Sequence, residues 1–264
     1  MIRLVALDID GTLLEPGVHV DTLPGEPITR AVEDLMDAGV VVVLATGRMY
    51  PGTAYVANHL GITQPLICQQ GASVHHLDGQ LQHGCTIEEE IALELIEFAQ
   101  SYQWSLAWFD SERYLVTSNN EAALFFAEVS RVDMEIHPEP HKSGVRATGI
   151  DIISTREHST DVHRLLEARY GSRITLLDFP SVTAIHAPLA SKGNAVSKLA
   201  QELGIKQSEV LAIGDSINDV SMLSWAGHSA APQHCDPYAR ESAKEILEGD
   251  GVDGVAAKLR SIIS

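Results

Sequence analysis

The apolar run that begins at Ile2 ends at two aspartates separated by one residue. This pattern predicts a buried strand with Asp8 and Asp10 on the same face at its carboxyl end, after which Gly11-Thr12 lets the chain leave the sheet. Two neighbouring carboxylates repel each other unless a cation lies between them, and Mg²⁺ with its oxygen ligands explains the pair. The alternative is a capped strand-to-turn corner, because Asp and Gly are ordinary turn residues.

Two later apolar runs also end in polar residues. Residues 40–45 and 210–213 are continuously apolar, which is typical of strands buried on both faces of a parallel sheet. The carboxyl ends of such strands meet at one edge of an open α/β sheet, where ligands bind. The polar residues at this edge are Thr46, Gly47 and Arg48 after one run, Asp215, Ser216, Asn218 and Asp219 after the other, and Lys192 at a helix start between them.

These groups together contain what phosphoryl transfer requires. The set offers a carboxylate nucleophile, a metal site, a cation and a hydroxyl for the phosphoryl oxygens, and an acid or base for the leaving and attacking oxygens. Taken singly, Lys192 is also explained as a solvated helix-start residue, and Asp219 as a first-turn acid favoured by the helix dipole. The joint order and spacing favour the catalytic interpretation.

Composition limits the partners of this chain. It has 264 residues, with 36 acidic residues against 18 Lys plus Arg and a formal net charge of −18. Such a field repels polyanions, so we expect neither nucleic acid nor an anionic membrane surface as partner. No signal peptide or membrane span is expected at the N-terminus. Cys68, Cys85 and Cys235 are odd in number and widely spaced, which favours reduced thiols and a cytoplasmic location.

The character of the sequence changes in its middle third. We predict a doubly wound, Rossmann-like α/β core domain from residues 1–84 and 186–264, with an inserted α+β domain at 85–185. The insertion alternates short mixed strands with helices, which predicts a half-exposed sheet with helices on one face. After the insertion, the parallel-sheet pattern returns, and a helix is expected over 237–247.

At this point the chain resembles a known family. It is similar to phosphatases of the haloacid dehalogenase-like superfamily, in the Cof-type branch with a type IIB α+β cap. The resemblance spans nearly the whole chain, and the insertion falls between the second and third motifs, as in that branch. The matching motifs are Asp8-Ile9-Asp10-Gly11-Thr12, Thr46-Gly47-Arg48, Ser191-Lys192-Gly193 and the run from Gly214-Asp215 through Asn218-Asp219 to Leu223.

The resemblance implies a role for each matching residue. Asp8 would form an aspartyl-phosphate, while Asp10 would protonate the leaving group and then deprotonate water. Mg²⁺ would be held by the carboxylates of Asp8 and Asp215 and the backbone carbonyl of Asp10. Thr46 and Lys192 would hold phosphoryl oxygens. Asp219 and Ser216 would contact and orient these groups without touching the substrate. The expected substrate-binding residues are Gly11, Thr12, Gly47, Arg48 and Asn218.

Three places depart from the family pattern, one of which is the segment Ala231-Pro232-Gln233-His234-Cys235 in place of the more usual Met-Gly-Asn-Ala. Gln70 stands where an Asn is usual, and Ala184 stands where an acidic residue is common, eight residues before Lys192. The departures affect expected substrate contacts and not the phosphoryl-transfer set. Further candidates for substrate contact in the insertion and its end are Trp104, Trp108, Arg113, His186 and the Ser118-Asn119-Asn120 turn.

The resemblance and the residues together predict an enzyme. We expect a Mg²⁺-dependent phosphomonoesterase acting on a small soluble phosphate ester, with sugar phosphates first and phosphoglycolate or a phosphorylated cofactor next. A phosphomutase of the same superfamily and a non-catalytic phosphate-binding protein are the alternatives. We expect a monomer or a homodimer.

Overall fold

Four-residue apolar strands form the centre of a five-stranded parallel sheet in the computed structural model, which describes residues 1–249 and 251–263. Asp250 and Ser264, both in the expected core segment 186–264, lie outside the described residues. The strand order is β14-β13-β12-β1-β2, so the three predicted apolar strands are neighbours. The strands are β1 (Leu4–Leu7), β2 (Val41–Leu44), β12 (Val210–Ile213), β13 (His228–Ala231) and β14 (Glu245–Ile246).

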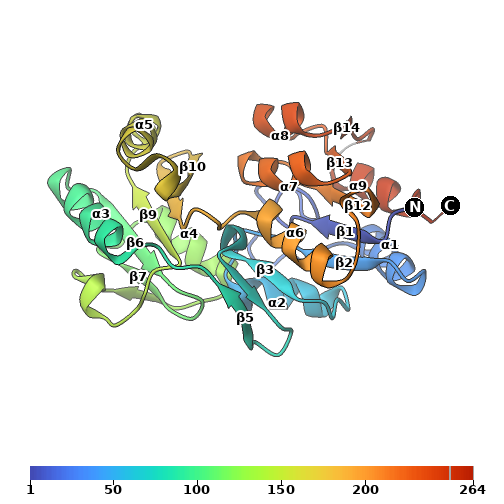
Figure 1. Cartoon of the computed structure of the whole chain (residues 1–264), viewed down its shortest axis with the longest axis horizontal. Coiled ribbons are helices and arrows are strands. Elements are labelled where there is room, and N and C mark those ends of the chain that lie inside the picture. The colour runs from blue at the N-terminus through green and yellow to red at the C-terminus, as the bar shows by residue number, and fades with distance from the viewer. Residues whose placement is uncertain (250, 264) are drawn as a thin grey trace.

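Helices cover both faces of this sheet, as a doubly wound fold requires (Figure 1). Val5 and Leu7 on β1 pack towards α1, α2 and α9, whereas Leu4 and Ala6 pack towards α6, α7 and α8. We call this part the core lobe. Its helices are α1 (Glu26–Asp37), α2 (Tyr50–His59), α6 (Lys192–Glu202), α7 (Val220–Trp225), α8 (Pro237–Ser242) and α9 (Gly251–Arg260).

The helix expected over 237–247 is wrong in its second half. The α8 helix ends at Ser242, because Ala243 adopts extended backbone angles. Glu245 then pairs with Ala230, and β14 becomes the edge strand of the parallel sheet. Leu247 is buried by this pairing and joins the core, so sheet packing overrides the local helical pattern.

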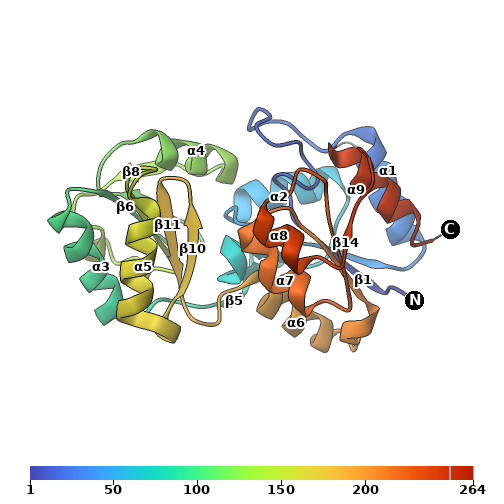
Figure 2. The same cartoon turned by 90° about the horizontal axis from the view of Figure 1, so that it is seen from above.

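A six-stranded sheet, largely antiparallel, forms the second lobe, in the order β10-β11-β9-β6-β7-β8. The elements from α3 to β11 make up this part, which we call the inserted lobe (Figure 2). They are α3 (Glu89–Ser101), β6 (Ser105–Phe109), β7 (Tyr114–Val116), α4 (Glu121–Ser130), β8 (Met134–Ile136), β9 (Gly149–Ile153), α5 (Ser159–Tyr170), β10 (Thr175–Phe179) and β11 (Val182–His186).

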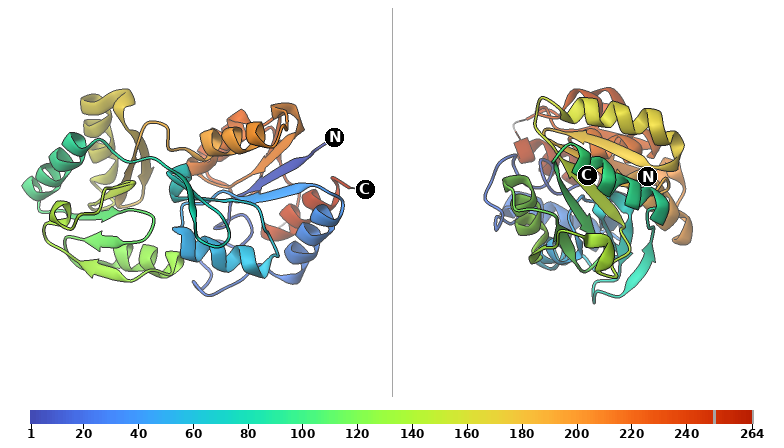
Figure 3. Two further views of the ribbon diagram at one scale, coloured as in Figure 1. Left: turned by 60° about the horizontal axis from the view of Figure 1, so that its bottom comes forward. Right: turned by 90° about the vertical axis from the view of Figure 1, so that its left-hand side faces the viewer.

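The helices of the inserted lobe do not all lie on one face, contrary to the sequence-based expectation. Helices α3 and α5 cover the outer face, against Leu106, Ile150 and Ile185. Figure 3 shows both helices on the side remote from the core lobe. Helix α4 packs on the opposite face, where its small residue Ala123 allows close approach to the aromatic rings of β6 and β7.

A small antiparallel sheet stands between the lobes in the chain. It consists of β3 (Leu66–Cys68), β4 (Ser73–His75) and β5 (Leu81–Gly84), and a bridge from Ala45 to Ile67 attaches it to β2. The chain then passes into the inserted lobe and returns at the start of α6 (Figure 3). Among residues 1–249 and 251–263, no helix has the length and apolar content needed to cross a membrane.

Candidate active site

Lys192 lies between two aspartates from different strand ends. Its ammonium nitrogen Nζ donates to Oδ1 of Asp8 and to Oδ1 of Asp219, each at 2.6 Å, and the lysine is fully buried. Lys192 is the first residue of α6, where Ser191 caps the helix by accepting from the amide of Asn194. The next residue, Gly193, lets α6 approach the backbone of Ser221, because a Cβ at this position would lie 2.3 Å from the carbonyl oxygen of Ser221.

The electrostatics of this cluster follow from burial. Burial alone would lower the pKa of Lys192, but the carboxylates of Asp219 and Asp8 raise it above its usual range, so the lysine is charged. Burial, and then the charge of Asp219, raise the pKa of Asp8 well above its usual range despite the lysine. The raised pKa of Asp8 shows that one ammonium group does not offset the surrounding carboxylates when they are ionised. A further cation would therefore stabilise their ionised forms.

Asp8, Asp215 and Asp219 form the acidic group among the described residues with oxygens close enough to share one metal ion, within 4.8 Å of one another. Both oxygens of Asp219 are already occupied, one by Lys192 and the other by the amides of Asp215 and Ser216. From the described residues, the carboxylate of Asp215 accepts a single hydrogen bond, from the hydroxyl of Thr12 at 3.4 Å. Asp8 and Asp215 thus retain unused oxygen lone pairs, which are ligands of the hard type that Mg²⁺ prefers.

The metal-binding arrangement depends on a glycine and on burial. Gly11 has a φ of +81°, and a Cβ at this position would lie 2.2 Å from Oδ2 of Asp215. Burial, followed by the charge of Asp219, raises the pKa of Asp215 to about 7. A divalent cation between Asp8 and Asp215 would lower both pKa values again, because it stabilises the ionised carboxylates.

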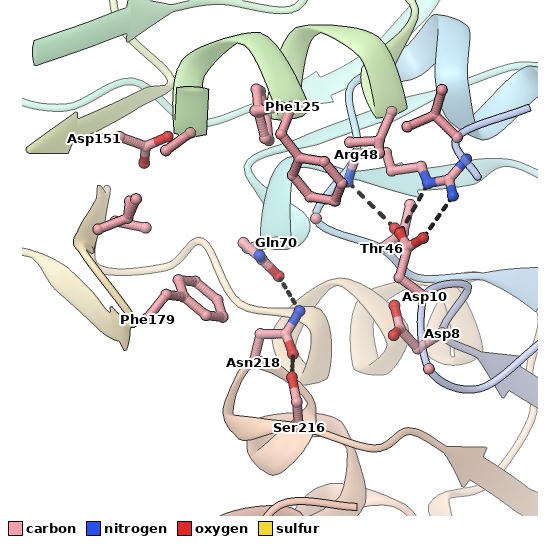
Figure 4. Close-up of a pocket in the computed structure, with 18 of the residues that line it drawn as sticks. Asp8, Asp10, Thr46, Arg48, Gln70, Phe125, Asp151, Phe179, Ser216 and Asn218 are labelled. Atoms are coloured by element: carbon pink, nitrogen blue, oxygen red, sulfur yellow. Dashed lines mark hydrogen bonds and ion pairs between the residues drawn. The ribbon is translucent and has the colours of Figure 1, made fainter. Parts of the chain in front are cut away.

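Arg48 holds the side chain of Asp10. Its Nε and Nη2 donate to the two carboxylate oxygens at 2.8 and 2.6 Å, in a bidentate geometry (Figure 4). The guanidinium is buried, and its backbone amide donates to the hydroxyl of Thr46. Arg48 lines the cavity between the lobes, and its charged group forms an ion pair with Asp10. The paired oxygens of Asp10 are thereby held in one orientation.

A second polar chain crosses the cavity from Gln70 to Ser216. The amide of Asn218 donates to Oε1 of Gln70 at 3.1 Å, and its own oxygen accepts from the hydroxyl of Ser216 at 2.5 Å (Figure 4). Gln70 has a φ of +59° and fills the space beside Gly47, where a Cβ would lie 2.5 Å from its Nε2. The side chain of Gln70 therefore connects Asn218 to the region beside Gly47.

These residues line a cavity of about 440 Å³ between the two lobes. Asp8, Asp10, Gly11, Thr46, Gly47, Arg48, Ser216 and Asn218 contribute to its wall, so most of the predicted site residues lie together. Lys192, Asp215 and Asp219 lie beside Asp8 without lining the cavity. Thr12 is fully buried and also lies outside the lining.

Of the candidates named in the inserted region and at its end, only His186 lines this cavity. The Trp108 ring packs on the outer face and donates to the carbonyl of Val145, and Trp104 stacks on Tyr102. Arg113 pairs with Glu135, while Asn120 caps α4. Sequence reasoning missed Asp151, an acid in the otherwise apolar strand β9 that lines the cavity from the inserted lobe.

The chain belongs to the haloacid dehalogenase-like hydrolases, because residues 5–259 match that family. It is 29% identical to a phosphoglycolate phosphatase of Halorubrum lacusprofundi over 274 residues, covering 99% of each chain. It is 25% identical to the 5-amino-6-(5-phospho-D-ribitylamino)uracil phosphatase YwtE of Bacillus subtilis, over 99% of this chain and 98% of the relative. The fold matches a haloacid dehalogenase-like hydrolase from B. subtilis with a TM-score of 0.86 at 23% identity, over 98% and 99% of the two chains.

The family and its named relatives identify the chain as a phosphatase of the Cof-type branch. Relatives that cover this chain almost completely are named for different phosphate esters. These relatives therefore share the reaction class and differ in the substrate for which they are named.

Proposed function

We propose that the chain is a Mg²⁺-dependent phosphomonoesterase that forms an aspartyl-phosphate on Asp8. The observation that carries this proposal is the buried contact between Nζ of Lys192 and Oδ1 of Asp8 at a cavity of metabolite size. Oδ1 of Asp8 accepts from Lys192 and has a second lone pair that would hold the metal, so Oδ2, which accepts no hydrogen bond from any described residue, is left to attack phosphorus. The membership of the hydrolase family supports the same reaction class.

Mg²⁺ fits the donor set found here. The carboxylates of Asp8 and Asp215 and the backbone carbonyl of Asp10 would hold the ion, and Asp219 would position Lys192 because its own oxygens are occupied. When bound, the ion offsets the negative charge of the carboxylate and the phosphate and polarises the phosphoryl group.

The residues of the chain divide the reaction into two displacements. In the first, Asp8 attacks phosphorus and the ester P–O bond breaks, while Asp10, protonated on one oxygen that has left its contact with Arg48, gives this proton to the leaving oxygen. In the second, water attacks the same phosphorus, Asp10 takes the proton, and the bond to Asp8 breaks to free phosphate. Arg48 orients Asp10 through its bidentate contact, while Thr46 and Lys192 hold phosphoryl oxygens.

The inserted lobe and the residues around the phosphate would complete the active site. Residues 85–185 would act as a cap on the core formed by 1–84 and 186–264, excluding bulk water and contacting the leaving group. Gly11, Thr12, Gly47 and Asn218 would shape the phosphate side of the site. We propose a small soluble phosphate ester as the substrate, in the cytoplasm, with the protein as a monomer or homodimer and without a nucleic-acid or membrane partner.

The test is phosphate release from p-nitrophenyl phosphate with Mg²⁺ and after chelation by EDTA. We expect activity that requires the metal, and we expect Asp8→Asn to abolish it while circular dichroism shows an unchanged fold. Turnover of the wild-type kind in that variant would contradict the mechanism. With a hexose monophosphate, free phosphate rather than an isomeric phosphate separates the phosphatase from a phosphomutase.

A further inference from the structure

Asp151 is a buried carboxylate of the inserted lobe. It lies in the middle of β9, is only 7% exposed, and lines the cavity shared with Asp8 and Asp10. No hydrogen bond or ion pair reaches its side chain from the described residues. A buried carboxylate with no partner is costly to keep, because it gives up its contacts with water and gains nothing in return. Its place in a cavity indicates a ligand group as the missing partner.

The position of Asp151 relative to the reacting groups fits the leaving-group end of a substrate. Figure 4 shows it across the cavity from Asp8 and Asp10, with Phe125 from α4 and Phe179 from β10 on the two sides. A phosphate at Asp8 therefore directs the rest of its ester towards β9. Asp151 is paired in register with Ala107 and Ala184, so the small neighbours on both adjacent strands leave it accessible from the cavity.

The lining around Asp151 is apolar. The inserted lobe contributes mainly aromatic and aliphatic side chains, among them Phe109, Phe125, Phe126, Ile153, Phe179 and Val182. A sugar leaving group needs a polar partner for most of its hydroxyls, and this wall does not supply them. The ionised form of Asp151 would repel a carboxylate leaving group such as that of phosphoglycolate.

The nearby titratable groups do not neutralise Asp151. His186, on the same sheet face, donates from Nδ1 to the carbonyl of Thr148, and burial lowers its pKa to about 4, so it is uncharged at neutral pH. The hydroxyl of Tyr114 is buried without a hydrogen-bond partner among the described residues, and Asp151 contributes to raising its pKa. The Asp151 carboxylate and the Tyr114 hydroxyl thus lie in an apolar environment without hydrogen-bond partners among the described residues.

We propose that Asp151 is a specificity-determining residue that binds a protonated nitrogen of the leaving group. The substrate class is then the phosphate monoester of an apolar alcohol, with a ring or branched chain, that carries one basic nitrogen. The inference rests on the proposed phosphatase function, and it places sugar phosphates behind such esters. A protonated nitrogen supplies the positive partner that Asp151 lacks among the described residues, while the phenylalanines cover the apolar body.

The test compares benzyl phosphates that differ only in one ring substituent: aminomethyl, hydroxymethyl or methyl, each at the meta or para position. For the better isomer, we expect kcat/KM for the aminomethyl ester to exceed that for the methyl ester by about tenfold or more, because a charge-assisted hydrogen bond forms in an apolar site. An equal or lower value in the wild-type protein would overturn the inference. A preference for the hydroxymethyl ester would do the same, since it assigns a neutral partner to Asp151.

Single substitutions test whether the preference for the aminomethyl ester depends on Asp151. Asp151→Asn should lower the ratio of aminomethyl to methyl ester by about tenfold, whereas Asp133→Asn, which changes an exposed aspartate of the same lobe, should keep the wild-type ratio. A ratio that survives Asp151→Asn would contradict the assignment. If this variant does not fold, the wild-type ratio alone still decides the inference.

Binding without catalysis separates the inference from the proposed function. Ligand-observed NMR measures the binding of aminomethyl benzyl alcohol and its methyl counterpart by the whole protein, with no phosphate ester present. Preferential binding of the amine supports the role of Asp151 even if no ester is hydrolysed, in which case only the phosphatase function fails. Hydrolysis of all esters without any preference for the amine sinks the inference alone.

Discussion

The ammonium group of Lys192 lies 2.6 Å from Oδ1 of Asp8, and both side chains are almost completely buried. Replacing the lysine would leave Asp8 and Asp219 buried without their cation. We expect Lys192→Met to lower the free energy of unfolding by about 3–5 kcal/mol, the usual cost of removing one partner of a buried ion pair. Urea denaturation in EDTA measures this change without interference from metal.

Lys198 provides the matched control, because it lies on the same helix and is exposed. Lys198→Met should change the free energy of unfolding by no more than about 0.5 kcal/mol. Equal effects of the two substitutions would show that the buried contact contributes nothing specific to stability.

The bidentate contact between Arg48 and Asp10 predicts a catalytic effect of a conservative change. Arg48→Lys keeps the charge but cannot bind both carboxylate oxygens, so Asp10 loses its fixed orientation. We expect kcat for p-nitrophenyl phosphate to fall by about tenfold, equivalent to about 1.4 kcal/mol. Arg30→Lys, in an exposed pair with Glu26, should leave kcat unchanged. A kcat of wild-type size in Arg48→Lys would exclude orientation of Asp10 by this residue.

Metal affinity distinguishes the roles of the acidic residues. Asp215 would ligate through its carboxylate, so Asp215→Asn should weaken Mg²⁺ binding by about tenfold or more, and Asp8→Ala should also weaken it. Asp10 would ligate through its backbone carbonyl alone, so Asp10→Asn should slow turnover and spare the affinity. Isothermal titration with Mg²⁺ measures all three variants independently of activity. Equal losses in Asp10→Asn and Asp215→Asn would refute this division of roles.

Burial of Asp151 predicts a pH dependence of stability. Burial raises the pKa of Asp151 to about 7 from an ordinary value of 3.8, so the folded protein holds this proton more tightly than the unfolded chain. This group therefore adds up to about 4 kcal/mol to the free energy of unfolding below about pH 4, and the protein loses this stabilisation as the pH rises through about 7.

Asp151→Asn removes this titration, so its stability relative to the wild type should increase between pH 5 and pH 8. Urea denaturation of both proteins at the two pH values, in EDTA, measures the difference, and the other acids cancel in the comparison. Parallel pH profiles for the two proteins would show that Asp151 does not titrate in this range. Tyr114 and His186, on the same sheet face, are present in both proteins.

Much of the core lobe can be predicted from the sequence, because its strands carry a strong local signal. Val41–Leu44 and Val210–Ile213 are continuous apolar runs, and each is a strand in the parallel sheet. Strand order in such folds brings the carboxyl ends together, so the meeting of Asp8 with Lys192 follows from topology. The helix expected over 237–247 fails because Glu245–Ile246 pairs with a strand that is distant in sequence.

The details of the site depend on contacts that local patterns do not encode. The pairing of Arg48 with Asp10 joins two separate strand ends, and either residue alone is equally suited to contact substrate. Asp151 had one signal, a single acid in the apolar stretch Gly149–Ile153, but the sequence does not say which face of that strand meets the core lobe. The orientation of the inserted lobe supplies this information.

The covalent role of Asp8 is tested most directly by isolating a phosphorylated peptide after rapid acid quench. In Asp10→Asn, p-nitrophenolate leaves without needing a proton, whereas attack by water lacks its base, so the phosphoenzyme should accumulate. We expect a burst of p-nitrophenol equal to the amount of enzyme, with mass spectrometry placing one phosphoryl group on Asp8. A burst without phosphate on Asp8, or phosphate on another residue, would contradict the mechanism.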